Sequence, residues 1–188
     1  AASRTGYNTL AMRMWDHTRS IDYLCSRPDV DRRHVGCLGC SGGGMATMYT
    51  AGIDERVSAA ILSSMPPYLV EVPGQFFNDM WSDGNPGDAW APLATTPSIT
   101  PNVCALTIPR ALWIMDGRAD ATSWGGDDKG ALTQALAKWQ AARDEVARLY
   151  ALAGVPDRFR QSWFDGGHCA GLTVANAAEW FREWGFRR

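Results

Sequence analysis

The sequence lacks the features that would assign it to several specialised classes of protein. It has no hydrophobic run long enough to cross a membrane, and its first residues do not combine a charged region with an apolar one. Its formal net charge is −2, with acidic and basic residues interspersed, so no basic stripe for nucleic acid is present. We therefore expect neither a membrane nor a nucleic acid as a partner. A mature secreted protein would also lack a leader, so the compartment stays open.

The length and composition of the chain are those of one ordinary globular domain. The chain has 188 residues, of which 46% are hydrophobic and 20% charged, enough for one domain with a sizeable core. Its five cysteines are an odd number at irregular spacing, so at least one is unpaired within the chain. We expect buried free thiols rather than a disulfide framework. The cysteines are Cys25, Cys37, Cys40, Cys104 and Cys169.

Hydrophobic periodicity predicts helices that alternate with short strands, the first three of them buried. The expected helices cover 7–26, 41–52, 129–153 and 173–186. The expected strands cover 34–39, 57–64, 111–115 and 159–164. Such alternation indicates a mostly parallel sheet with helices on both faces, in a three-layer α/β domain over residues 1–188. The proline-rich segment 65–109 interrupts this order and is predicted to be a lid-like excursion over an active-site mouth.

Glycines surround one serine directly after the first predicted strand. The letters GCSGG, residues 39–43, match the G-x-S-x-G pattern of a nucleophile elbow. A serine on such a sharp strand-to-helix turn has a strained backbone, and we expect Gly39 and Gly43 to approach too closely for side chains. The helix that begins at Gly42 would direct its N–H groups and positive dipole end at an oxyanion. Ser41 is therefore the candidate nucleophile.

A histidine lies where an elbow serine needs a base. His168, in the letters DGGHCAG, directly follows the last predicted strand. In a parallel sheet, functional groups collect at the carboxyl ends of the strands. The other two histidines, His17 in the first helix and His34 at the start of a strand, cannot reach Ser41 from there. His168 is therefore the candidate general base.

Two aspartates follow the third predicted strand, and one of them can orient the imidazole. The chain order serine, aspartate, histidine is that of an α/β-hydrolase triad. The carboxylate must stand on the loop beyond the strand to meet the ring, which favours Asp120 over Asp116. At the end of the strand, Asp116 is expected to accept hydrogen bonds from loop N–H groups.

Competing interpretations of the same segments remain open. Cys37 and Cys40 form a C-x-x-C pair, as in a thioredoxin-like redox site, although Cys37 should be buried in the sheet. A phosphate-binding loop is weaker still, because the glycine-rich segment has no P-loop lysine. Aromatic residues of the excursion and of the loop before residue 129 are candidates for substrate contact or for simple packing. They are Phe76, Phe77, Trp81, Trp90 and Trp124.

Three segments together resemble a known family. They are MWDHTRSIDYLCSRPDVDRRHVGCLGCSGGG, IPRALWIMDGRAD and AGVPDRFRQSWFDGGH. They resemble the α/β-hydrolase superfamily, in particular its acetyl xylan esterase and dienelactone hydrolase-like branch. The resemblance implies hydrolysis of carboxylic esters, often acetyl groups on carbohydrates, with no metal and no cofactor. It covers nearly the whole chain except residues 65–103.

Residue by residue, the resemblance implies a complete set of roles. Ser41 would be the nucleophile, His168 the general base and Asp120 the acid of a glycine-x-x-aspartate loop. The N–H of Gly42 would be the elbow half of the oxyanion hole. Dienelactone hydrolases use a cysteine nucleophile, so Ser41, with Cys40 beside it, places the sequence on the esterase side.

The family also has strands before the first helix of this sequence, and these supply half of the sheet and the second oxyanion N–H. We therefore expect a fragment, a second polypeptide that carries those strands, or a homo-oligomer. An apolar strand at Val35–Leu38 is typical of a strand with neighbours on both sides. The leading prediction is a serine carboxylesterase. The alternatives are a serine peptidase of the same fold and a non-catalytic subunit that binds a partner.

Overall fold

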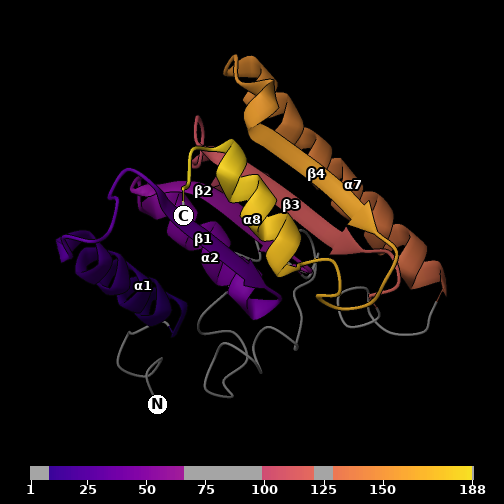
Figure 1. The fold of residues 1–188 in the computed structure, drawn as a ribbon. Coiled ribbons are helices and arrows are strands. Elements are labelled where there is room, and N and C mark those ends of the chain that lie inside the picture. The colour runs from indigo at the N-terminus through magenta and orange to yellow at the C-terminus, as the bar shows by residue number, and fades with distance from the viewer. Residues whose placement is uncertain (1–8, 66–98, 121–128, 188) are drawn as a thin grey trace.

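A computed structural model describes residues 9–65, 99–120 and 129–187. Four parallel strands form one sheet in the order β1-β2-β3-β4 (Figure 1). The strands are β1 (Val35–Cys40), β2 (Val57–Ser63), β3 (Ala111–Gly117) and β4 (Phe159–Phe164). The parallel sheet between helices confirms the predicted α/β class.

The helices cover both faces of this sheet. They are α1 (Thr9–Ser26), α2 (Gly42–Ile53), α5 (Ile99–Ala105), α7 (Lys129–Leu152) and α8 (Val174–Glu183), with a short 3₁₀ helix at Pro156–Arg158. Buried residues of α1, α2, α5 and α7 form one core with one face of the strands, and α8 forms a second core on the opposite face. Figure 1 shows α8 in front of the sheet, which gives the expected three layers.

Successive residues of β2 enter the two cores in turn. Ala60 and Leu62 belong to the larger core, whereas Ala59 and Ile61 pack on the side of α8. This alternation has a period of two, and both faces of the strand are covered by helices. A strand of this kind reads as a continuous apolar run, which is why the sequence pattern indicated its position.

The predicted excursion is only partly within the described residues. Residues 66–98 lie outside them, and the rest of the segment includes α5. A Cβ added at Gly52 would lie 3.3 Å from the carbonyl oxygen of Val103, so α5 packs directly on α2. Cys104 of α5 is fully buried in the larger core. The end of the excursion therefore contributes to the core. None of the helices described is both long and apolar enough to span a membrane.

Candidate active site

Ser41 occupies a sharp turn between β1 and α2. Its backbone has φ 58° and ψ −124°, a conformation that residues with side chains rarely adopt. Two hydrogen bonds hold the turn: the Ser41 N–H donates to the Ser63 carbonyl at 2.9 Å, and the Met45 N–H donates to the Ser41 carbonyl at 3.1 Å. Gly42 follows directly and begins α2. A strained serine at this kind of junction has the backbone of a nucleophile elbow.

The glycines around Ser41 have unequal roles. A Cβ at Gly39 would overlap the backbone carbonyl of Gly43, so the predicted close approach is confirmed at Gly39. The expectation for Gly43 itself is wrong, because a Cβ there would meet nothing within 4 Å. The second position that requires glycine is Gly44, since a Cβ added there would lie 2.9 Å from the Ser63 carbonyl oxygen. The turn therefore needs glycine at 39 and 44, where strands and helix pack backbone to backbone.

Asp120 and His168 meet at the carboxyl end of the sheet. His168 Nδ1 lies 2.8 Å from Asp120 Oδ2. The Asp120 carboxylate is fully buried, and the His168 side chain is 28% exposed. A buried carboxylate at Nδ1 fixes the orientation of the ring and leaves Nε2 on its other side.

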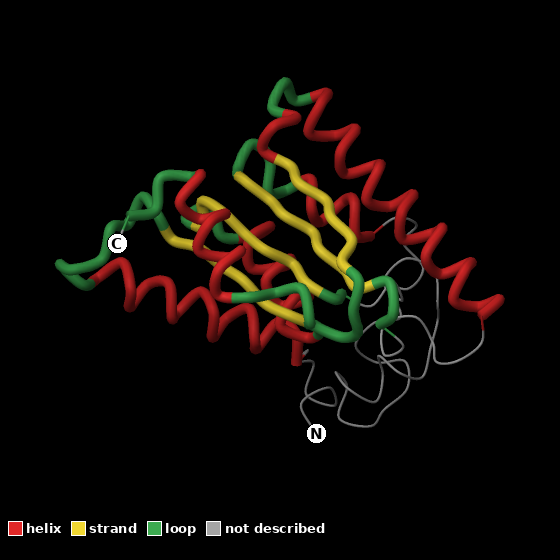
Figure 2. Tube along the Cα trace, turned by 45° about the vertical axis from the view of Figure 1, so that its right-hand side comes forward, coloured by secondary structure: helices red, strands yellow, loops and turns green. Residues whose placement is uncertain are grey.

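Backbone contacts hold the acid loop against the histidine loop. The Arg118 N–H donates to the Phe164 carbonyl at 3.0 Å, and the Ala119 N–H donates to the Gly166 carbonyl at 3.1 Å. Figure 2 shows the loops that follow β3 and β4 side by side at this end of the sheet. The pairing of Asp120 with His168 is thus supported by main-chain geometry as well as by the side chains.

A disulfide joins Cys40 and Cys169, the neighbours of Ser41 and His168. The two Cα atoms are 5.8 Å apart, and 129 positions separate the cysteines in the sequence. The expectation of free thiols is therefore wrong for this pair, because a disulfide depends on proximity in the fold and not on spacing. The expectation is confirmed for Cys104, which is free and buried, whereas Cys25 and Cys37 are free but only half-buried.

The disulfide also contradicts the C-x-x-C redox interpretation. Cys40 is bonded to Cys169 and not to Cys37. The Cys37 sulfur lies 3.5 Å from Thr47 Oγ1, and burial raises the pKa of its thiol. A half-buried thiol that is kept protonated is a poor nucleophile and a poor metal ligand.

The disulfide places His168 beside the elbow. One ring nitrogen of His168 and the sulfurs of Cys40 and Cys169 all lie within 4.8 Å of one another. In the described part of the chain this is the group with the spacing of a metal site, but disulfide sulfurs are not the thiolates that bind zinc. Among the described side chains, Ser41 and His168 share no hydrogen bond, and such bonds are often long before substrate binds.

Asp116 points away from this site and into the protein. Its fully buried carboxylate accepts hydrogen bonds from the Met65 N–H at 3.2 Å and from Trp139 Nε1 at 2.7 Å. Burial raises its pKa to about 6, against the attraction of the Arg143 guanidinium 3.4 Å away. The predicted acceptance from a loop N–H is confirmed. The sequence pattern did not indicate Trp139 and Arg143, two α7 residues that meet Asp116 inside the core.

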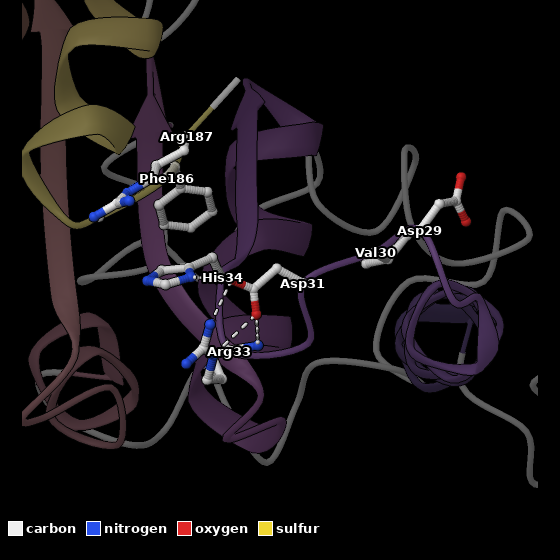
Figure 3. Close-up of a pocket in the computed structure, with 8 residues that line it drawn as sticks. Asp29, Val30, Asp31, Arg33, His34, Phe186 and Arg187 are labelled. Atoms are coloured by element: carbon white, nitrogen blue, oxygen red, sulfur yellow. Dashed lines mark hydrogen bonds and ion pairs between the residues drawn. The ribbon is translucent and has the colours of Figure 1, made fainter.

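The other two histidines lie elsewhere. His17 Nδ1 is 2.8 Å from Thr50 Oγ1, between α1 and α2. His34 lines a pocket of about 670 Å³ at the amino end of β1, opposite to the end that carries Ser41. Figure 3 shows Asp31 in that pocket, bonded to Arg33 and to His34, whose Nδ1 is 2.8 Å from the carboxylate. The five aromatic candidates for substrate contact, Phe76, Phe77, Trp81, Trp90 and Trp124, lie outside the described residues.

Part of the sequence is similar to that of known proteins. No family model matches the chain. The chain is 46% identical over 56 residues to the acetyl esterase Axe7A of Xylanibacter ruminicola, a match that covers 27% of this chain and 13% of the esterase.

Solved structures match over much more of the chain. A glucuronoyl esterase from Solibacter usitatus aligns with a TM-score of 0.66 and 19% identity, over 94% of this chain and 48% of that protein. A glucuronoyl esterase from Sporotrichum thermophile aligns with a TM-score of 0.66 and 17% identity, over 94% and 51%. The chain thus spans about half the length of these structures, and a smaller part of the acetyl esterase. Over this length the chain shares the α/β-hydrolase fold of the matched structures, and 56 of its residues align with the acetyl esterase.

Proposed function

We propose that this protein is a serine carboxylesterase in which Ser41 is the nucleophile, His168 the general base and Asp120 the acid. The contact between His168 Nδ1 and Asp120 Oδ2, 2.8 Å long, carries the proposal. It supplies an oriented imidazole in the loop that the disulfide ties to the strained turn at Ser41. A hydroxyl becomes an effective nucleophile when such a base is beside it.

The reaction would proceed through an acyl-enzyme. Ser41 Oγ attacks the ester carbonyl carbon while His168 Nε2 takes the hydroxyl proton. The imidazolium, stabilised by Asp120, then gives this proton to the departing alkoxide oxygen. Water, deprotonated by His168, attacks the acyl carbon, and the proton returns to Ser41 as the carboxylic acid leaves.

The oxyanion that forms in both steps would lie at the start of α2. The Gly42 N–H follows the nucleophile and is the proposed donor there, aided by the positive end of the helix dipole. A second N–H is needed for full stabilisation, since one missing donor costs about 3–4 kcal/mol in the transition state.

We further propose that additional strands pair with β1, on a second polypeptide or a second copy of the chain. In the described sheet β1 has β2 as its partner and ends one side of the order. Leu38 of β1 is 48% exposed, and an apolar edge of this kind is normally covered. Such strands would bring the second oxyanion donor. Native mass spectrometry at low micromolar concentration tests this, and a fully active single chain would contradict it.

Acetyl esters of carbohydrates are the proposed substrate class, because the sequence relationship is to an acetyl esterase. Release of acetate from acetylated xylan and hydrolysis of p-nitrophenyl acetate test this. Cleavage of peptide anilides in preference to both would favour the peptidase alternative.

The Ser41→Ala variant tests the mechanism. It should abolish ester hydrolysis, because the attacking hydroxyl is removed. The unfolding transition should stay unchanged, because alanine has the same Cβ as serine and so adds no backbone strain at this positive φ. Ser58→Ala is the matched control, since Ser58 lies near the opposite end of β2 and bonds to the Val35 carbonyl. Retention of most of the rate in Ser41→Ala would refute the serine mechanism.

A further inference from the structure

Residues with positive φ mark three loops around the candidate site. Among the described residues other than glycine, positive φ occurs at Ser41 (58°), Ser64 (47°) and Cys169 (62°). They follow β1, β2 and β4, all at the carboxyl end of the sheet. Strained residues of this kind cluster at functional sites. Ser41 and Cys169 already belong to the elbow and the histidine loop, whereas Ser64 has no role in the mechanism above.

The Ser64 side chain connects the end of β2 to the histidine loop. Ser64 is fully buried, and its N–H donates to the Met115 carbonyl at 3.0 Å, which fixes it to β3. Its hydroxyl oxygen accepts the N–H of Cys169 at 2.9 Å, across 105 positions of sequence. A glycine would tolerate the positive φ more easily but could not make this bond.

The bonded N–H belongs to the peptide group between His168 and Cys169. Ser64 therefore holds the backbone of His168 from the interior of the sheet. Asp120 holds the imidazole at Nδ1, and the disulfide holds the Cys169 side chain to the elbow. These three attachments come from three different strands, so together they fix the position of the ring relative to Ser41.

We propose that Ser64 is a positioning residue, which sets the place of the His168 imidazole through the Cys169 N–H. The inference rests on the proposed function, because it assigns to His168 the role of base. Without the hydroxyl the peptide group loses its acceptor and the ring can move, and a displacement of about 1 Å costs about 10²-fold in rate.

The first experiment compares Ser64→Ala with Ser58→Ala. Alanine has a Cβ like serine, so the backbone strain at positive φ is the same in both proteins and only the hydroxyl is removed. The kcat for p-nitrophenyl acetate should fall about 10- to 100-fold in Ser64→Ala with KM unchanged, because the base and not the binding surface is displaced. Ser58→Ala should keep the wild-type kcat.

A second readout does not depend on turnover. The Nδ1 proton shared with Asp120 gives a low-field NMR resonance, which should shift or broaden in Ser64→Ala while the ring signals of His17 and His34 stay in place. If the wild-type protein shows no hydrolysis that depends on Ser41, the proposed function fails. The His168 resonance would still show whether Ser64 positions the imidazole.

An unchanged kcat together with an unchanged His168 resonance in folded Ser64→Ala would overturn the proposal. If Ser64→Ala does not fold, Ser64→Gly replaces it, because glycine lacks the hydroxyl and also relieves the backbone. A folded Ser64→Gly with the wild-type kcat and resonance would overturn the proposal equally.

Discussion

β1 and β3 are both short apolar strands that deliver residues to the candidate site, but their surroundings differ. All seven residues of β3 are buried, and the strand lies between β2 and β4. β1 is at the end of the described sheet, with Val35 buried and Leu38 48% exposed. The acid side of the site therefore rests on the core of the chain, whereas the serine side lies at a boundary.

The two sides are stabilised in different ways as a result. Behind β3, Asp116 is held inside the core by Trp139 and Arg143 of α7. Beside β1, the elbow is held by close backbone packing at Gly39 and by the disulfide from Cys40 to the histidine loop. The strained turn at Ser41 thus depends on local attachments, whereas the end of β3, which leads to Asp120, is held by packing in the core.

The largest effect after loss of the serine is expected at Asp120, beyond the end of β3. Asp120→Asn should lower kcat by about 10⁴-fold, because the imidazole loses the carboxylate that orients it and stabilises its charge. Steady-state hydrolysis of p-nitrophenyl acetate measures this. Asp165→Asn, an exposed aspartate in the histidine loop, is the control and should be near wild type. Equal rates for the two variants would mean that Asp120 is not the acid.

The Asp116→Asn substitution should change the stability of the protein and the dependence of that stability on pH. Burial raises the pKa of Asp116 to about 6, so the folded state binds a proton that the unfolded state releases near pH 3.8. Stability from this group is present below pH 3.8 and is lost as pH rises through about 6, by up to about 3 kcal/mol. Urea unfolding of Asp116→Asn between pH 4 and 7 should lack this decline.

Asp54 provides the control of opposite sign. Its hydrogen bonds from Arg56 lower its pKa, so its contribution is present above the unfolded pKa and is lost as pH falls through the folded one. Asp54→Asn should therefore remove stability at neutral pH. If Asp116→Asn instead behaves like Asp54→Asn, the attraction of Arg143 outweighs burial at Asp116.

The smallest effect is expected at Leu38. In the monomeric chain, Leu38→Ala should lower the free energy of unfolding by less than about 0.5 kcal/mol, because the Leu38 side chain is half exposed. Ile114→Ala in β3, fully buried, should cost about 2–5 kcal/mol. Denaturant unfolding measures both. A cost at Leu38 close to that at Ile114 would mean that β1 is already covered, and a cost that rises on assembly would support the proposed strand partner.

Much of the fold could be predicted from local pattern. The strand expected at 159–164 is β4 as observed, and it lies between the turn at Pro156–Arg158 and the glycine pair at 166–167. The prediction for the end of α2 is wrong by one residue: the expected helix ends at Gly52, and the observed helix continues to Ile53. Asp54 caps it there, and Gly52 serves close packing against Val103 instead.

Long-range pairings could not be predicted in this way. The disulfide joins positions 129 residues apart, and no spacing rule connects them. Arg143 lies on a helix that the hydrophobic periodicity predicted at 129–153, yet its side chain is buried, where it pairs with the Asp116 carboxylate inside the core. The bond from Cys169 to Ser64 likewise exists only once β2 and β4 share a sheet.

Reaction with a fluorophosphonate probe tests the central claim most directly. The probe modifies serines that an oriented base has activated, so the folded protein should form one adduct, located on Ser41 by peptide mapping. The adduct should be absent after denaturation and in Ser41→Ala, and strongly slowed in Asp120→Asn. A folded wild-type protein that forms no adduct on Ser41 would contradict the account and favour a non-catalytic binding role.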